Sequence, residues 1–393
     1  MTNHSPSDLS PNTRKPEAFA AFELDPDYLH LNHGSFGAVP RAVRVAQDRI
    51  RAEIERNPTK FYGEDLPPMM RAMAAPVAQR FGGRSDDWVF CENATAAVSS
   101  VLHSLDLKPG DEIVTTSHAY GAVLKAMTLV AARRGVELKL AAIPPIVESD
   151  DEVVENIARA LGPRTRLLII DHITSATAII FPAARIAALA RAAGIPILID
   201  GAHAPGQIAL DVPSLGADWY TGNAHKWLFA PRGCGLLWTA PSRQELTRPA
   251  VLSHGTDHGY TDAFDWVGTR DPSPWLCFDA AARAHDGFGG PELIAHNNEL
   301  AEHAVLELSA ALNARVTAPR AMRGAMATFV LEDRSISEAA ALALRGTLSK
   351  THRVMVPVHG FGGRLCFRIS AQIYNDLGDY RRFPEIARPL FRG

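Results

Sequence analysis

Short apolar segments alternate with longer helical segments through most of this 393-residue chain. Each apolar segment is bounded by Gly, Pro or charged residues, as buried strands are. The segments between them are rich in Ala and Arg. Parallel strands need crossover helices, so this alternation predicts an α/β fold with a mainly parallel sheet. The expected strands are 113–116, 167–170, 197–200 and 235–238, and the expected helices are 121–134, 153–161 and 184–193.

The alternation ends near residue 279, where we expect a smaller α+β domain to begin. The chain is long enough for about two domains. In the second part we expect a long helix at 291–312, a strand at 326–332, a helix at 337–348 and a strand at 364–370. The predicted organisation is a flexible leader at 1–24, a large domain at 25–278 and a small domain at 279–393, with a contribution from about 25–40.

Composition narrows the classes of partner. The net charge is −3 and the pI about 6.6, which gives no reason to expect nucleic acid or an anionic membrane. The most apolar stretch, 167–181, is interrupted by Asp171 and His172 and is too short to span a bilayer. The N-terminus lacks the apolar core of a signal peptide. The four cysteines show no paired spacing, which fits reduced thiols in the cytoplasm and argues against a metal site.

The most specific chemical signal is Asp200 followed 26 residues later by Lys226. Asp200 ends an apolar strand, and Lys226 lies behind a histidine on a later turn. A pyridoxal phosphate (PLP) enzyme needs a lysine that bonds to the cofactor and an acid that keeps the pyridine nitrogen protonated. Either residue alone has an ordinary interpretation, as a surface charge or a strand end. Together they predict a PLP enzyme.

A phosphate site is expected at Asn93-Ala94-Thr95, just before a run of small residues. Amides at a helix N-terminus bind phosphate well, and Ala94 and Thr95 would supply them. The alternative is that Asn93 is an ordinary helix cap. Asn223 and His225 flank the phosphate side of the lysine turn by the same reasoning, with a core or capping role as their alternative.

These elements are ordered as in a known family. The chain resembles the class V aminotransferase family, fold-type-I PLP enzymes, and within it the isopenicillin N epimerase-like branch. The likeness runs from about Tyr28 to Asn375. It implies a fold-type-I PLP-dependent transferase with a small C-terminal domain, and it names no substrate. The motifs that carry it are Asn-His-Gly-Ser-Phe-Gly at 32–37, Asp-Gly-Ala-His-Ala-Pro-Gly at 200–206, Gly-Asn-Ala-His-Lys-Trp at 222–227, Gly-Thr-Arg-Asp at 268–271, and Arg-Ile-Ser at 368–370.

The resemblance also implies roles around the cofactor ring. Asp200 pairs with the ring nitrogen, His203 reaches the ring hydroxyl, and His118 stacks on the ring face, with a strand-end histidine as the alternative for His118. Ser175 lies near the position where relatives place an asparagine against the ring hydroxyl, and Thr174 is the substitute for it.

The resemblance also implies residues that bind the substrate and one that reaches the neighbouring subunit. Arg368 matches the arginine that binds the substrate carboxylate, a task suited to a planar bidentate donor. Arg270 assists it, or is a surface arginine; Asn32 and His33 complete the substrate side. Thr269 resembles a residue donated to the neighbouring subunit's phosphate site, so a homodimer with composite active sites is implied.

The same comparison argues against cysteine desulfurase chemistry. Desulfurases carry a nucleophilic cysteine on a loop before the carboxylate-binding arginine. The corresponding stretch here, 356–363, contains no cysteine, and Cys366 falls inside the next expected strand. We expect Cys366 to be a small buried apolar residue.

The predicted function is therefore PLP chemistry at the Cα of a small amino acid. Lys226 moves the Cα proton, and His118, with Tyr120 beside it, is the expected second proton-transfer group of an epimerase or racemase. The alternatives are a carbon–sulfur β-lyase, then an aminotransferase, and remotely a non-catalytic scaffold. A dinucleotide-binding protein is disfavoured because no GxGxxG motif follows an early strand.

Overall fold

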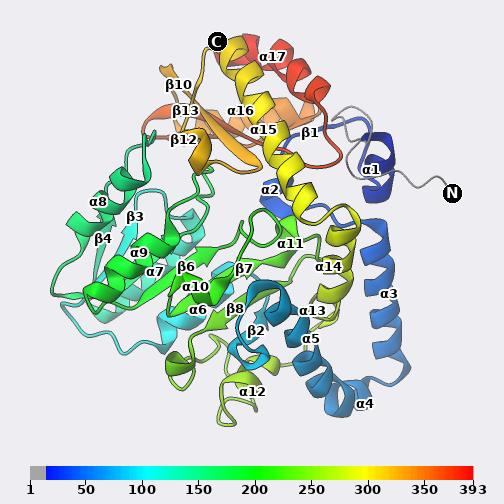
Figure 1. The fold of residues 1–393 in the computed structure, drawn as a ribbon, viewed down its shortest axis with the longest axis vertical. Coiled ribbons are helices and arrows are strands. Elements are labelled where there is room, and N and C mark those ends of the chain that lie inside the picture. Colours follow the sequence, from blue (N-terminus) through cyan, green and yellow to red (C-terminus); the bar gives the residue numbers. More distant parts are fainter. Residues whose placement is uncertain (1–14, 393) are drawn as a thin grey trace.

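The computed structural model describes residues 15–392 and confirms the predicted fold class. A seven-stranded sheet fills the lower part of the molecule in Figure 1, and a four-stranded antiparallel sheet lies above it. The large sheet has the order β2-β8-β7-β6-β5-β3-β4, and only β8 runs antiparallel to its neighbours. Its strands are β2 (Trp88–Cys91), β3 (Glu112–Thr116), β4 (Glu137–Ala141), β5 (Thr165–Asp171), β6 (Ile197–Gly201), β7 (Trp219–Asn223) and β8 (Gly235–Thr239).

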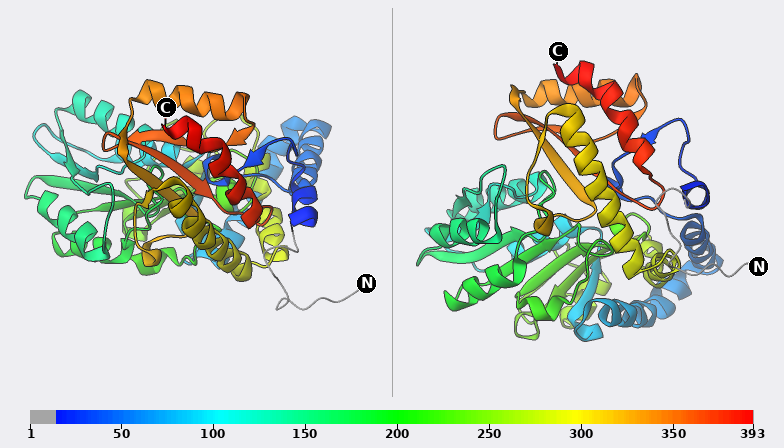
Figure 2. Two further views of the ribbon diagram at one scale, coloured as in Figure 1. Left: turned by 90° about the horizontal axis from the view of Figure 1, so that it is seen from above. Right: turned by 45° about the horizontal axis from the view of Figure 1, so that its top comes forward.

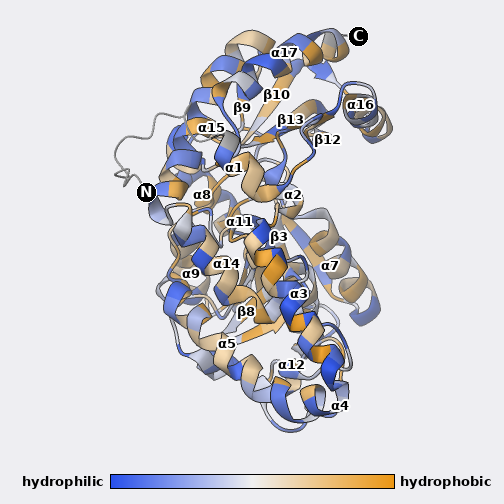
Figure 3. Cartoon of the chain, turned by 90° about the vertical axis from the view of Figure 1, so that its right-hand side faces the viewer, coloured by the Kyte–Doolittle hydropathy of each residue, from blue (hydrophilic) through white to orange (hydrophobic). Residues whose placement is uncertain are grey.

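Helices cover both faces of this sheet. Successive side chains of β5 point to opposite faces: Leu167 and Ile169 pack with α6 and α7, and Leu168 and Ile170 pack with α8 and α9. Figure 3 shows hydrophobic residues along β8 and many hydrophilic ones on the surrounding helices. These helices are α3 (Arg41–Arg56), α4 (Pro58–Lys60), α5 (Leu66–Phe81), α6 (Ala94–Ser104), α7 (Gly121–Arg134), α8 (Asp150–Ala160), α9 (Ala183–Ala192), α10 (Val212–Leu215), α11 (Ala224–Trp227), α12 (Tyr260–Asp265), α13 (Ser273–Leu276) and α14 (Phe278–Gly287).

The smaller region has its own core. Phe329 and Phe367 stack on adjacent strands with ring centroids 4.7 Å apart, and the helices α15 and α17 lie side by side next to this sheet (Figure 2). The division into domains at about residue 278 stays a prediction. The elements of this region are α15 (Pro291–Leu312), β9 (Arg315–Val316), β10 (Met326–Ser335), α16 (Glu338–Lys350), β11 (Val354–Met355), β12 (Val358–Phe361), β13 (Arg364–Ser370) and α17 (Leu377–Arg392).

The N-terminal segment joins the smaller region. The strand β1 (Leu29–His30) pairs in parallel with β11, and the short helix α2 (His33–Phe36) follows it. The flexible leader predicted at 1–24 is wrong for α1 (Lys15–Phe22), because Phe22 is buried against Phe229 and Tyr374, with ring centroids 5.2 Å away from each. Residues 1–14 lie outside the described part of the chain. Within residues 15–392, no helix has both the length and the apolar character that a membrane crossing needs.

Candidate active site

Three neighbouring strands of the large sheet end at one cavity. Asp171 ends β5, Asp200 lies at the end of β6, and Asn223 ends β7 just before the lysine turn α11. Carboxyl ends of parallel strands are where α/β sheets bind their ligands. The cavity has a volume of about 340 Å³. Its walls are formed by Ser35, Phe36, Glu92, Asn93, Ala94, Thr95, Tyr120, Asp171, Ser175, Asp200, Ala202, His203, Asn223, His225, Lys226, Arg232 and Gly233.

The predicted pair of Lys226 and Asp200 lies in this cavity. Lys226 Nζ is 3.1 Å from His203 Nε2. Burial lowers the pKa of the amine to about 7, with a further lowering from Arg368, while the two aspartates oppose both effects. Asp200 is 3% exposed and its Oδ1 accepts the Ala202 N–H at 3.0 Å. Burial raises the pKa of Asp200, whereas the Ala202 N–H and Lys226 lower it, so a cation beside this carboxyl group favours its charged form.

The start of α6 forms the other end of the cavity. Asn93 Oδ1 caps the helix by accepting the Ala96 N–H at 2.9 Å, and Asn223 Oδ1 accepts the Ala94 N–H at 2.8 Å. The Thr95 hydroxyl has no hydrogen bond to another described residue, and its amide lies in the first turn of α6, where no intrahelical acceptor is available. The capping alternative for Asn93 and the phosphate prediction therefore coexist, because a capped N-terminus still leaves the Thr95 amide and hydroxyl for an anion.

These residues fit pyridoxal phosphate. His203 Nδ1 is buried without a partner, as it would be if it awaited the ring hydroxyl. His225 also lines the cavity, and its Nδ1 lies 3.2 Å from the Cys234 carbonyl oxygen, which leaves Nε2 for the phosphate. An amine, a buried carboxylate and a free helix amide thus surround one space of suitable chemistry. No group of three or more His, Cys, Asp or Glu among residues 15–392 is placed to hold a metal ion.

Arg368 lies behind the cavity wall and not among the lining residues. Its Nη1 donates to the Ser175 carbonyl oxygen, and its Nη2 lies 3.1 Å from Ser35 Oγ. A weaker contact of 3.4 Å reaches Asn32 Oδ1, and Nε is buried without a partner. Burial lowers the pKa of this guanidinium to about 10. Ser175 lines the cavity as expected, whereas the hydroxyl of Thr174 bonds that of Thr177 at 2.7 Å.

His118 is not among the cavity-lining residues. Its Nδ1 lies 2.7 Å from Thr177 Oγ1, and its Nε2 lies 3.0 Å from the Pro144 carbonyl oxygen. The ring packs against Phe361 with centroids 4.8 Å apart. Tyr120, two residues further along and 44% exposed, lines the cavity instead. Tyr120, and not His118, therefore lines the same cavity as Lys226.

Asn32 and His33 also lie outside the cavity lining. His33 Nε2 is 3.0 Å from the Lys226 carbonyl oxygen and Nδ1 is 2.9 Å from Tyr374 Oη, so this histidine fixes the backbone of the lysine turn. The motif at 32–37 ends in a glycine for a steric reason. At φ +68°, Gly37 lies so close to the lysine turn that a Cβ would meet the His225 carbonyl oxygen at 2.1 Å. Of this segment, Ser35 and Phe36 reach the cavity.

The predicted residues of the 268–271 turn are also placed outside the lining. Arg270 pairs with Glu92 and lies over the Trp275 ring, with its guanidinium carbon 4.6 Å from the ring centroid. Thr269 is exposed.

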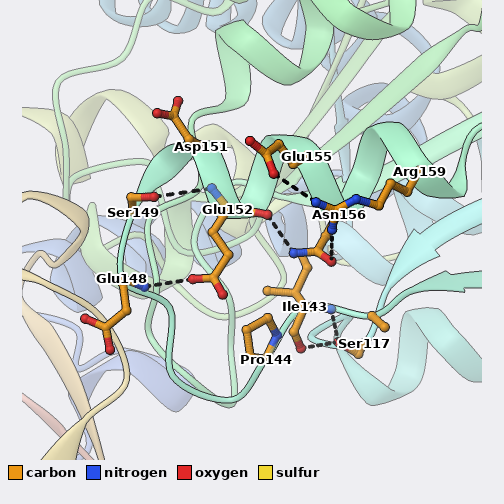
Figure 4. Close-up of a pocket in the computed structure, with 11 residues that line it drawn as sticks. Ser117, Ile143, Pro144, Glu148, Ser149, Asp151, Glu152, Glu155, Asn156 and Arg159 are labelled. Atoms are coloured by element: carbon orange, nitrogen blue, oxygen red, sulfur yellow. Dashed lines mark hydrogen bonds and ion pairs between the residues drawn. The ribbon is translucent and has the colours of Figure 1, made fainter.

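A larger cavity of about 850 Å³ lies elsewhere, at the start of α8, and is lined by acidic residues of that helix and by Ile143 and Pro144 (Figure 4).

The sequence analysis gave no role to seven lining residues: Ser35, Phe36, Glu92, Asp171, Ala202, Arg232 and Gly233. Asp171 directly follows the expected strand 167–170, much as Asp200 ends the expected strand 197–200, and this position is a signal for it. Phe36, 70% exposed, and Arg232 carried no comparable signal, because only the packing of α2 against the lysine turn brings them to the cavity. Arg232 Nη2 donates to the Gly37 carbonyl oxygen at 2.9 Å.

The sequence profile of the family described as "Aminotransferase class-V" matches residues 51–383. The chain belongs to this family. It is therefore a PLP-dependent enzyme, and pyridoxal 5'-phosphate is its cofactor. This confirms the resemblance that the motifs indicated.

Among similar proteins is the isopenicillin N epimerase of Amycolatopsis lactamdurans, 33% identical over 93% of this chain and 96% of that protein. A probable chloroplastic L-cysteine desulfhydrase of Arabidopsis thaliana is 30% identical over 94% and 84%, respectively. Among solved structures, a C-DES mutant with glycine covalently linked to its PLP cofactor has a TM-score of 0.79 at 19% identity, covering 94% of this chain and 98% of that one. A cysteine desulfurase from Thermococcus onnurineus has a TM-score of 0.77 at 18% identity, covering 97% and 99%. At these identities the structures support the fold alone.

Proposed function

We propose that this enzyme breaks and remakes the Cα–H bond of a small amino acid, as an epimerase or racemase does. The observation that carries the proposal is the buried amine of Lys226 in the same cavity as the carboxylate of Asp200. With a pKa of about 7, Lys226 has a neutral, proton-accepting form near neutral pH. PLP, when bound, supplies the electron sink for the Cα carbanion.

The other residues bind and orient. Asp200 would keep a proton at the ring nitrogen of bound PLP, and His203 and Ser175 would hold its ring hydroxyl. Thr95, Asn223 and His225 would bind the phosphate, whereas the Ala94 N–H, predicted to do so, is donated to Asn223 instead. Arg368, held by Ser175 and Ser35, binds the substrate carboxylate after a small movement of its free Nε–H towards the cavity.

Epimerisation needs a second proton-transfer group on the face opposite Lys226. With both ring nitrogens of His118 engaged elsewhere, we assign this role to the Tyr120 hydroxyl. The likeness to isopenicillin N epimerases at 33% identity supports the choice of an epimerase reaction.

The second candidate is a carbon–sulfur β-lyase, which needs Lys226 alone as a base. The likeness to L-cysteine desulfhydrases at 30% and 28% identity favours it, as does the remote placement of His118. The product separates the two: an epimerase inverts Cα, whereas a lyase releases pyruvate, ammonia and a thiol or sulfide.

The test incubates the PLP-loaded enzyme with a panel of L- and D-amino acids in deuterium oxide. Chirality, Cα deuterium, pyruvate, oxo acids and sulfide are followed together. Inversion with Cα deuterium supports the epimerase. Pyruvate without inversion rejects it in favour of the lyase, and stoichiometric oxo acid indicates an aminotransferase. Lys226→Ala is the blank for each signal.

We also propose a cytoplasmic homodimer with composite sites. Thr269 is exposed and lies outside the cavity of its own chain, as a residue donated to a partner subunit would. All four cysteines are free and buried, which suits a reducing compartment. Mixing Lys226→Ala and Thr269→Ala protomers should restore part of the activity if sites are composite, and a fully active monomer would refute the dimer.

A further inference from the structure

A second buried carboxylate lies beside Asp200. Asp171 and Asp200 are register partners on the adjacent parallel strands β5 and β6, so their side chains leave the same face of the sheet. Both line the cavity, and they are 5% and 3% exposed. The roles proposed above use Asp200 alone, so a second buried acid in the same cavity is unexplained.

Asp171 also connects two elements of the site. Its carboxylate faces the backbone of Tyr120, which lowers the carboxyl pKa; Tyr120 precedes α7 and lines the cavity. The end of β5 thereby lies next to the start of α7. A side chain that only filled space here would not need a charge-bearing acceptor.

We propose that Asp171 is a positioning residue of the cofactor cavity: it adds a second negative charge beside Lys226 and Asp200, and it holds the Tyr120 turn in place. This inference rests on the roles of Lys226 and Asp200 proposed above. It concerns how strongly the cavity retains protons, and not a new reacting group.

Electrostatics gives the direction of the effect. The charged groups around Asp171 are Asp200 from β6 and Lys226 from α11, with Arg368 from β13 and His203 acting on Lys226. Burial raises the pKa of Asp171, the charge of Asp200 raises it further, and Lys226 lowers it. Burial and Asp200 therefore favour the neutral form of Asp171, and a cation beside it favours the charged form, so that the carboxylate and the cation stabilise each other. Removing one should therefore let that cation lose its proton at lower pH.

Asp171→Asn isolates the charge, because the amide oxygen can still face the Tyr120 backbone. In the PLP-loaded enzyme, two pH midpoints are measured: that of the visible cofactor absorbance, and that of the ring-nitrogen NMR shift with ¹⁵N-labelled PLP. We expect at least one to fall by about one pH unit, with the thermal unfolding midpoint nearly unchanged. Asp171→Glu should move it back towards the wild-type value. Asp151→Asn, which removes an exposed aspartate charge at the start of α8, should leave both midpoints in place.

Asp171→Ala loses the charge and the acceptor together. It should show the same midpoint shift and, in addition, weaker PLP binding and a lower unfolding temperature, because the Tyr120 turn is released. The inference is overturned if both midpoints in Asp171→Asn match wild type while Asp200→Asn shifts them. If Asp200→Asn shifts neither midpoint, the proposed role of Asp200 fails, and the inference fails with it.

Discussion

The two halves of the active site differ in what places their side chains. Asp200, Asn223 and Lys226 lie at or just after the ends of adjacent strands, where sheet register fixes them. His118, Asn32 and Arg270 come from loops and from the N-terminal segment, and none of them lines the cavity. Strand ends leave little freedom to the backbone, whereas a loop side chain goes to whichever buried partner satisfies it.

His118 and Tyr120 show this competition within one turn. The imidazole finds a hydroxyl and a backbone carbonyl inside the protein, so it turns inward. The Tyr120 backbone faces Asp171, and Tyr120 lines the cavity. A motif therefore locates such a turn more reliably than it chooses which side chain of the turn faces the ligand.

The largest expected effect tests the residues at or just after the strand ends. Lys226→Ala should abolish turnover while the protein stays folded and still binds PLP non-covalently, because the phosphate site is separate from the lysine. Borohydride reduction followed by peptide mapping should attach the cofactor to Lys226 in wild type and to no lysine in the variant. Lys125→Ala, exposed on α7, is the matched control. Cofactor fixed to another lysine would refute the assignment.

Asp200→Ala should reduce Cα-proton exchange by several orders of magnitude while the cofactor still bonds to Lys226. The carboxylate matters most when negative charge moves into the ring, since a preorganised charge in a buried site acts on the transition state. Deuterium incorporation from solvent measures the exchange, and visible absorbance measures the bond. Wild-type exchange in the variant would contradict the role.

The sequence predicted the fold and the strand-end residues because both follow from local patterns. Apolar runs located β3, β5, β6 and β8, and motif order located Lys226. It left β2, β4 and β7 unassigned; polarity explains this for the partly exposed β4 alone, since β2 and β7 are buried along their whole length. Arg232 and Phe36 reach the cavity only through contacts between segments about 200 residues apart, which no local pattern records.

Substitutions of His118 and Tyr120 should affect different properties of the enzyme. Tyr120→Phe should slow Cα-deuterium incorporation from one enantiomer by about 10²-fold, because the hydroxyl is lost where we place the second proton transfer. His118→Ala should chiefly destabilise the protein, by about 2 kcal/mol or more, since it empties a buried position and removes the hydrogen bonds to Thr177 and to the Pro144 carbonyl oxygen. Exchange kinetics with each enantiomer, and urea unfolding, separate the two. Exchange lost equally for both enantiomers in His118→Ala alone would restore the stacking role expected from the sequence.

The smallest expected effect concerns the pH dependence of stability, and it tests whether His33 has a structural role. Burial lowers the pKa of His33 from 6.5 to about 3, so it stays neutral in the folded enzyme while the unfolded chain takes up a proton. Its stabilising contribution is complete above about pH 6.5 and is lost progressively as the pH falls below that value, by up to about 1.4 kcal/mol per pH unit.

His33→Gln should be less stable than wild type at neutral pH, yet its unfolding free energy should fall by about 1.4 kcal/mol less between about pH 7.5 and pH 5.5. Urea unfolding at the two pH values measures the difference, and His103→Gln, exposed on α6, should keep the wild-type slope. An unchanged slope together with a raised KM in His33→Gln would instead return this histidine to the substrate. Because His33 binds the Lys226 carbonyl oxygen, the slope shows whether the N-terminal motif supports the lysine turn or the ligand.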